Sequence, residues 1–248
     1  MTPAYSLAAG AALWEVVARL LDTERFPAFS AVVGVVIEMM IDGRLLEPLA
    51  ASLASLTLGL VAAAVIGTLV GLLMARSYVL EHMSGIYFDA LMAAPTLIYV
   101  PVLFALFGVT RAAQVATVFI YAFFVIAATT YSGIRAVDRR LLDMARAFGA
   151  SERQLFWTIA LPASAPVVLT GLRLGTMRAV KGMVIGEMII ALSGLGAMLK
   201  AYGSRFDMTG VLAVLLVIIL ISVSSNLIVG ALGRRIAGVR SMPVREVN

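Results

Sequence analysis

Asp143-Met144-Ala145-Arg146-Ala147-Phe148-Gly149, continued by Ile159-Ala160-Leu161-Pro162, is the stretch that decides how this chain can fold. It is a polar island in an apolar sequence, because residues 135–153 carry five arginines and three acids while long apolar segments lie on both sides. Leu141, Ala145 and Phe148 recur at helical spacing. This pattern predicts a helix with one apolar face and one charged face.

The residues after this helix predict a bend and a second helix. Gly149 suits a left-handed position just past a helix end, where a Cβ atom would be penalised. Ser151-Glu152-Arg153-Gln154 has the pattern of a capping box, with Ser151 as N-cap and Gln154 reaching back to it. The second helix is predicted over 152–160, with Pro162 and Pro166 ending it. The island is therefore predicted to be a helix, a glycine bend and a helix held outside the bilayer.

The composition excludes several classes of protein. Of 248 residues, 62% are hydrophobic and 13% charged, against roughly a quarter charged in soluble domains, and the mean hydropathy is +1.02. Without cysteine there is no disulfide or thiolate site, and a single histidine builds no cluster, so we expect no metal site. The net charge of +5 comes from basic residues that flank apolar segments. That placement indicates membrane topology rather than nucleic-acid binding.

Apolar segments predict an all-α membrane protein with six transmembrane helices. The first segment is short and contains Glu15 and Arg19, which are four residues apart and can pair. The third is expected to be kinked by Pro95 and Pro101. Residues 31–41 are too few to span and are expected to form an interfacial or buried helix. The predicted spans are 5–21, 49–74, 86–107, 112–130, 163–192 and 211–232.

The basic residues predict an orientation and a division of the chain. Ten lie outside the spans on the side of the island and the C-terminus, against five on the opposite side. The positive-inside rule therefore places the island and both termini in the cytoplasm. We divide the chain into an N-terminal membrane helix with an extracytoplasmic segment (1–48), a transmembrane domain (49–233) and a basic cytoplasmic tail (234–248).

The island resembles the cytoplasmic "EAA" loop of ATP-binding-cassette (ABC) importer permeases, whose pattern is Glu-Ala-Ala, three residues, Gly, nine residues, Ile, one residue, Leu-Pro. Asp143 stands for the Glu and Met144 for the first Ala. The remaining pattern positions are Ala145, Gly149, Ile159, Leu161 and Pro162. Stretches that resemble the nitrate/sulfonate/taurine branch of these permeases are Leu13-Trp14-Glu15 with Arg19, Gly171-Leu172-Arg173-Leu174, and Gly186-Glu187-Met188 before Ser193-Gly194-Leu195-Gly196.

The resemblance implies a type I ABC importer permease fold with a cytoplasmic coupling helix, in a bacterial inner membrane. It implies partners: two ATPase subunits, a second permease copy and an extracytoplasmic substrate-binding protein. The absence of an internal repeat favours a homodimer, although a heterodimer stays open. The region 135–162, here called the coupling loop, is expected to dock on the ATPase. The docking residues are expected to be Asp143, Ala145, Arg146, Phe148, Gly149, Ser151, Ile159, Leu161 and Pro162.

The chain has no nucleotide-binding loop of its own. Such a loop needs Gly-Lys followed by Ser or Thr, but Lys181 precedes Gly182 and Lys200 precedes Ala201. ATP and Mg are therefore expected on the partner ATPase. We expect this chain to bind no cofactor and not to be an enzyme.

The fifth span carries Arg173, Arg178, Lys181 and Glu187, which are costly within a bilayer. Arg178 and Lys181 share a face, whereas Glu187 lies about 180° from Arg178 on a straight helix. One hypothesis makes these charges a translocation path for an anion. The other makes them structural, paired with Asp89, with other buried acids or with carbonyl groups. Glycine pairs spaced by four, at 67 and 71, 171 and 175, and 182 and 186, are typical of close helix packing. The two pairs on the fifth span are expected to seat either a neighbouring helix or a second copy of the chain.

Taken together, the residues and the resemblance predict a permease that forms the path of a small anionic solute, such as a nitrate, sulfonate, taurine-like or organic acid. The alternative is a gradient-driven secondary transporter or channel. That class predicts inverted repeats of broken helices around a midplane site, and the sequence has no convincing repeat. Co-purification of a stoichiometric ATPase distinguishes the two.

Overall fold

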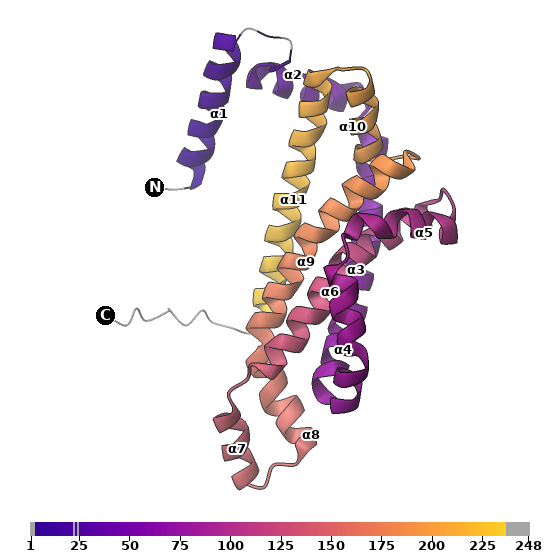
Figure 1. The fold of residues 1–248 in the computed structure, drawn as a ribbon. Helices are drawn as coiled ribbons and strands as arrows, with labels where there is room; N and C mark the ends of the chain where they lie inside the picture. The colour runs from indigo at the N-terminus through magenta and orange to yellow at the C-terminus, as the bar shows by residue number, and fades with distance from the viewer. Residues whose placement is uncertain (1–2, 22, 24, 237–248) are drawn as a thin grey trace.

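The computed structural model describes residues 3–21, 23 and 25–236, and every regular element in this part of the chain is helical (Figure 1). A helix satisfies its own backbone hydrogen bonds, which a segment surrounded by lipid requires. The all-α class is therefore confirmed. The helices are α1 (Pro3–Leu21), α2 (Phe29–Ile41), α3 (Leu46–Arg76), α4 (Tyr78–Ala93), η1 (Thr96–Ile98), α5 (Tyr99–Phe107), α6 (Arg111–Arg135), α7 (Arg139–Ala147), α8 (Glu152–Gln154), η2 (Leu155–Ala160), α9 (Leu161–Ile190), α10 (Leu195–Ser204) and α11 (Met208–Ile236).

Four described helices are long and apolar enough to cross a membrane, or five if a bent pair counts as one, against the six predicted. The four are α3, α6, the continuous helix Glu152–Ile190 and α11 over Met208–Gly233. The predicted third span is the bent pair, since the chain turns by 92° between Ala93 and Thr96. Pro95 lies at this break. Pro101 lies within the first turn of α5 and causes no second break in the helix.

The predicted first span forms as α1 but is not among the membrane-crossing candidates. The predicted pair within it is present, with Arg19 Nη2 2.6 Å from Glu15 Oε1. Glu15 also accepts a hydrogen bond from the Ser30 backbone at 2.9 Å, which ties α1 to the start of α2. The carboxylate thus joins two helices. As predicted, α2 is too short to span, with 13 residues.

The glycine pairs all face α6, which lies between α3 and α9. A Cβ atom at Gly71 would lie 2.7 Å from Thr130 Cβ on α6, and one at Gly67 would lie 3.1 Å from the Phe123 carbonyl oxygen. On α9, a Cβ at Gly182 would lie 2.8 Å from Tyr121 Cβ. Gly171, Gly175 and Gly186 meet α6 in the same way. These glycines therefore seat a neighbouring helix of the same chain, because only a missing side chain allows this approach.

Pro162 and Pro166 do not end the second helix of the island, contrary to the sequence prediction. The helix continues for 39 residues from Glu152 to Ile190. Its segment Leu155–Ala160 is a π-helix, and this wide turn ends two residues before Pro162. A proline has no N–H to donate, and a local π adjustment accommodates that loss. The second half of the island is therefore the extension of a membrane span.

Candidate functional site

Helix α7 ends in a bend that requires a residue with left-handed backbone conformation. Gly149 has φ +83°, as predicted, and no atom lies within 4 Å of the place a Cβ would take. The Ala150 N–H donates to the Ala145 carbonyl at 3.1 Å, and the Gly149 N–H donates to the Arg146 carbonyl at 2.9 Å. These two bonds form a Schellman motif. Glycine is needed at 149 for its backbone conformation alone.

The predicted capping box at the start of α8 is present. The Ser151 Oγ accepts a hydrogen bond from the Gln154 N–H at 3.4 Å. In return, the Gln154 Oε1 accepts from the Ser151 N–H at 2.8 Å. Two N–H groups at the helix start are thereby satisfied.

Arg146 joins the two helices across the bend. Its Nε donates to Glu152 Oε1 at 3.1 Å, and its Nη1 donates to Asp143 Oδ1 at 3.0 Å. Both carboxylates favour the charged guanidinium, Glu152 most, and so raise the pKa of Arg146 above its ordinary value. Asp143 precedes Gly149 in the chain and Glu152 follows it. By binding both carboxylates, the Arg146 side chain fixes the angle of the bend.

The coupling loop projects from one end of the bundle (Figure 1), and several of its apolar side chains are exposed. Phe148 is 86% exposed, and Leu141, Met144 and Trp157 are exposed as well. Among the other predicted docking residues, Pro162 is exposed, whereas Ala145, Ile159 and Leu161 are half-buried. Leu155, which the sequence interpretation passed over, is buried, with 3% of its surface exposed. Exposed apolar groups at a charged end are typical of a docking surface.

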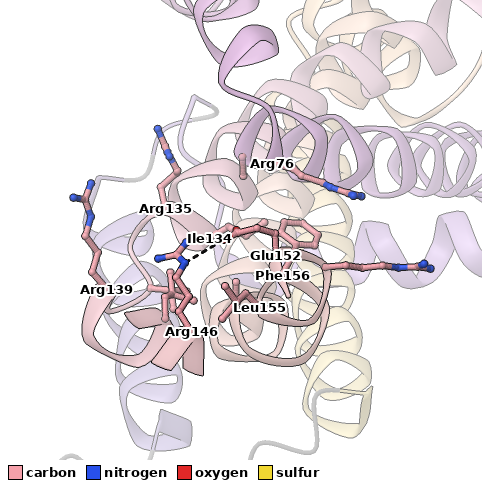
Figure 2. A pocket seen from close by; sticks show the side chains of 13 residues that line it. Arg76, Ile134, Arg135, Arg139, Arg146, Glu152, Leu155 and Phe156 are labelled. Carbon is pink, nitrogen blue, oxygen red and sulfur yellow. Dashed lines mark hydrogen bonds and ion pairs between the residues drawn. The ribbon is translucent and has the colours of Figure 1, made fainter. Parts of the chain in front are cut away.

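A cavity of about 570 Å³ separates the coupling loop from the ends of α3 and α6 (Figure 2). Figure 2 shows Arg135 and Arg139 on one side of it and Arg76 on the other. The Arg76 guanidinium lies over the Phe156 ring, 5.7 Å from its centre. The charged lining residues are five arginines and one acid: Arg76, Arg135, Arg139, Arg146, Arg153 and Glu152. This end of the molecule is therefore strongly basic.

Arg178 and Lys181 share a cleft of about 560 Å³ between α6, α9 and α11. Both side chains are exposed on the single chain, and their neighbours in the cleft are mainly apolar. No carboxylate lies within 4 Å of either among the side chains that the structure describes. The proposed partner Asp89 has a side chain outside that set. The two charges therefore stand together on an open face of α9.

Arg173 and Glu187 do not join that face. The Arg173 guanidinium lies against α11, where a Cβ at Gly230 would overlap it. Glu187 is 1% exposed and accepts hydrogen bonds from Ser52 Oγ at 2.8 Å and from the Gly196 N–H at 2.9 Å. The four charges that the sequence groups on one span thus have three different surroundings.

Long apolar helices seated on one another by glycines define an integral membrane protein. Over residues 63–238 the chain matches the family described as binding-protein-dependent transport system inner membrane component, and it belongs to that family. It is therefore the permease subunit of an ABC importer, a multi-pass protein of the inner membrane.

Relatives and solved structures agree with this family. The chain is 31% identical over 195 residues to the taurine transport system permease protein TauC of Escherichia coli, covering 79% of this chain and 71% of the relative. It is 29% identical over 212 residues to the formylaminopyrimidine transport permease protein ThiX of Halalkalibacterium halodurans, covering 85% and 84%. An inward-facing MetNI methionine ABC transporter has the same fold, with a TM-score of 0.62 at 19% identity, covering 76% of this chain and 92% of that one.

Proposed function

We propose that this permease is driven by separate ATPase subunits that dock on its coupling loop, and that it carries a small anionic solute inward. The observation that carries the docking proposal is the bend at Gly149, fixed by Arg146, which leaves Phe148 86% exposed. An aromatic side chain held out on a rigid turn can fill a pocket on a partner at little entropic cost. ATP and Mg belong to that partner.

The proposed orientation places the coupling loop and both chain termini in the cytoplasm. The arginines around the cavity beside the loop support it, because basic residues accumulate on the cytoplasmic side. The described end of α11 also supports it, since this helix runs from the end that carries α10 toward the end that carries α7 (Figure 1). Of the predicted basic tail (234–248), residues 234–236 belong to the end of α11, and residues 237–248 lie outside the part of the chain that the structure describes.

The proposed anion path rests on Arg178 and Lys181. Charged groups in the membrane normally face a water-filled cavity or another protein surface rather than lipid. Both side chains are exposed on the single chain, so another chain is needed to shield them from lipid. We propose that the shielding partner is a second copy of the permease. The positive charges enclosed between the two copies would then lower the energy barrier for an anion to pass.

Purification of the tagged permease from its native membrane tests the ATP-driven class. We expect a P-loop ATPase to co-purify in a ratio of one to each permease copy, and a solute-binding protein to raise the rate of ATP hydrolysis. The matched preparation is a variant with the docking aromatic removed, Phe148→Ala, which should retain less ATPase because an exposed anchor is lost. Uptake by the purified permease alone, driven by an ion gradient, would instead identify a secondary transporter.

A further inference from the structure

Four of the buried polar side chains that the structure describes gather at the turn between α9 and α10: Ser52, Ser55, Gln114 and Glu187. Among the described residues, Glu187 is the buried side chain that carries a charge, and it lies in the last turn of α9. Its Oε2 accepts from Ser52 Oγ at 2.8 Å and from the Gly196 N–H at 2.9 Å, while its Oε1 accepts from Ser55 Oγ at 3.3 Å. The carboxylate thereby touches α3 and α10 as well as its own helix.

Two further bonds fix the same turn. The Ser52 Oγ also accepts from the Leu195 N–H at 2.8 Å, so a single hydroxyl joins α3 to the first residue of α10. From α6, the Gln114 Nε2 donates to the Ser193 carbonyl at 3.2 Å. Three long helices therefore converge on residues 193–196. These bonds tie the turn to α3, α6 and α9, whereas the buried Ser193 Oγ in the same turn has no partner among the described residues.

Two glycines leave the room that the carboxylate occupies. A Cβ at Gly194 would overlap the Glu187 carboxyl group, and Gly194 also has φ +104°. A Cβ at Gly196 would lie 2.7 Å from Glu187 Cβ. The negative charge at the start of α10 is favourable, because helix N-termini stabilise anions. Glu187 is therefore satisfied within the chain and is not offered to a passing solute.

Glu187 and the coupling loop stand near opposite ends of one helix. The helix Glu152–Ile190 has 39 residues, which at 1.5 Å each give a length of about 58 Å. It starts directly after the glycine bend, at the capping box of Ser151. A continuous helix that contacts other elements at both ends can transmit a displacement from one end to the other.

We infer that Glu187 is a positioning residue for transport: it passes movement of α9 to α10 and α3 at the end of the permease away from the coupling loop. The inference rests on the proposed ATPase docking. The Glu187–Ser52–Gly196 cluster makes α9, α10 and the start of α3 move as one body. Without it, ATPase movement still reaches α9 but no longer moves the outer elements with it.

The test uses Glu187→Gln in the complete complex of permease, ATPase and binding protein in vesicles. The amide keeps the size of the side chain but removes the negative charge at the start of α10 and has one accepting oxygen instead of two. Ser52 Oγ and the Gly196 N–H share Oε2, whereas Ser55 Oγ donates to Oε1. An NH₂ group at the Oε1 position therefore faces the Ser55 donor, and one at the Oε2 position faces both the Ser52 and the Gly196 donors. We expect assembly and basal ATP hydrolysis within about twofold of the unmodified complex. Stimulation of hydrolysis by the loaded binding protein, and uptake, should each fall about tenfold.

Ser52→Ala removes the bridging hydroxyl without touching the charge, and it should act in the same direction. The double variant should be no worse than the worse single variant, because both changes break one network. Ser164→Ala is the matched control, since this buried serine lies on the same helix and donates only to the Leu161 carbonyl at 2.9 Å. It should leave stimulation unchanged.

Two results overturn the inference. One is an unchanged ratio of stimulated to basal hydrolysis in both Glu187→Gln and Ser52→Ala. The other is an equal loss of basal and stimulated hydrolysis together with a lower melting temperature, which would make the cluster merely structural. Failure of the unmodified complex to respond to the binding protein contradicts the proposed function itself, and is thus distinguished from either result.

Discussion

Replacing Gly149 with valine should leave a membrane-inserted permease that binds its ATPase at least about tenfold more weakly and imports little. Gly149 has φ +83°, a region that costs an L-residue roughly 1–2 kcal/mol, and more when it is β-branched. Each 1.4 kcal/mol is about a tenfold change in an equilibrium constant. The variant chain avoids the cost by opening the bend, which moves Phe148 and breaks the bridge made by Arg146. ATPase binding by the purified variant, followed by uptake in vesicles, measures both effects.

Two matched variants separate backbone conformation from added bulk. Ala150→Val places the same side chain one residue later, where φ is not positive, and it should bind the ATPase nearly normally. Gly149→Asn should fall between the two, because asparagine tolerates the left-handed region better than valine. Normal binding by Gly149→Val, or equal losses in all three variants, would show that the left-handed bend is not what the ATPase needs.

Neutralising Arg178 or Lys181 should reduce uptake by about tenfold while the protein stays folded. The structure places both side chains in an open cleft, and among the described side chains no carboxylate lies within 4 Å of either. Arg178→Gln and Lys181→Gln therefore leave no described acid unpaired, so the melting temperature should change little. The loss of a positive field that concentrates an anion, an effect of order 10–10³, lowers the rate of transport.

The measurements for this prediction are uptake and thermal unfolding on the same purified complexes. Lys200→Gln is the control, since this exposed lysine lies on α10 rather than in the cleft. Its uptake should match that of the unmodified permease. A large loss of thermal stability in both cleft variants would mean that the charges are structural, and full uptake with either charge removed would contradict an anion path.

Features set by neighbouring residues could be predicted from the sequence. The left-handed Gly149 and the capping box of Ser151 and Gln154 depend on bonds no more than five residues long. The pairing of Glu15 with Arg19 is equally local. Each of these requires a residue type at a fixed short spacing, so pattern alone identifies it.

Features set by tertiary contacts could not be predicted. The spacing of Gly171 and Gly175 indicates close packing but not that the partner is α6 of the same chain. The proline rule fails at Pro162 because the preceding π-helix has no sequence signature here. Glu187 was grouped with the path because its partner Ser52 lies 135 residues away. Chain separation, rather than weak chemistry, hides these contacts.

The most direct measurement of ATPase docking on the coupling loop is site-specific cross-linking from two equally exposed phenylalanines. Phe148 is 86% exposed on the coupling loop, and Phe206 is 88% exposed between α10 and α11 at the other end of the molecule (Figure 1). The chain has no cysteine, so Phe148→Cys and Phe206→Cys each introduce a unique reactive thiol. A short thiol-reactive cross-linker should join the ATPase to position 148 and not to position 206. An ATPase cross-linked through 206, or through neither position in an intact complex that hydrolyses ATP, would contradict docking on the coupling loop.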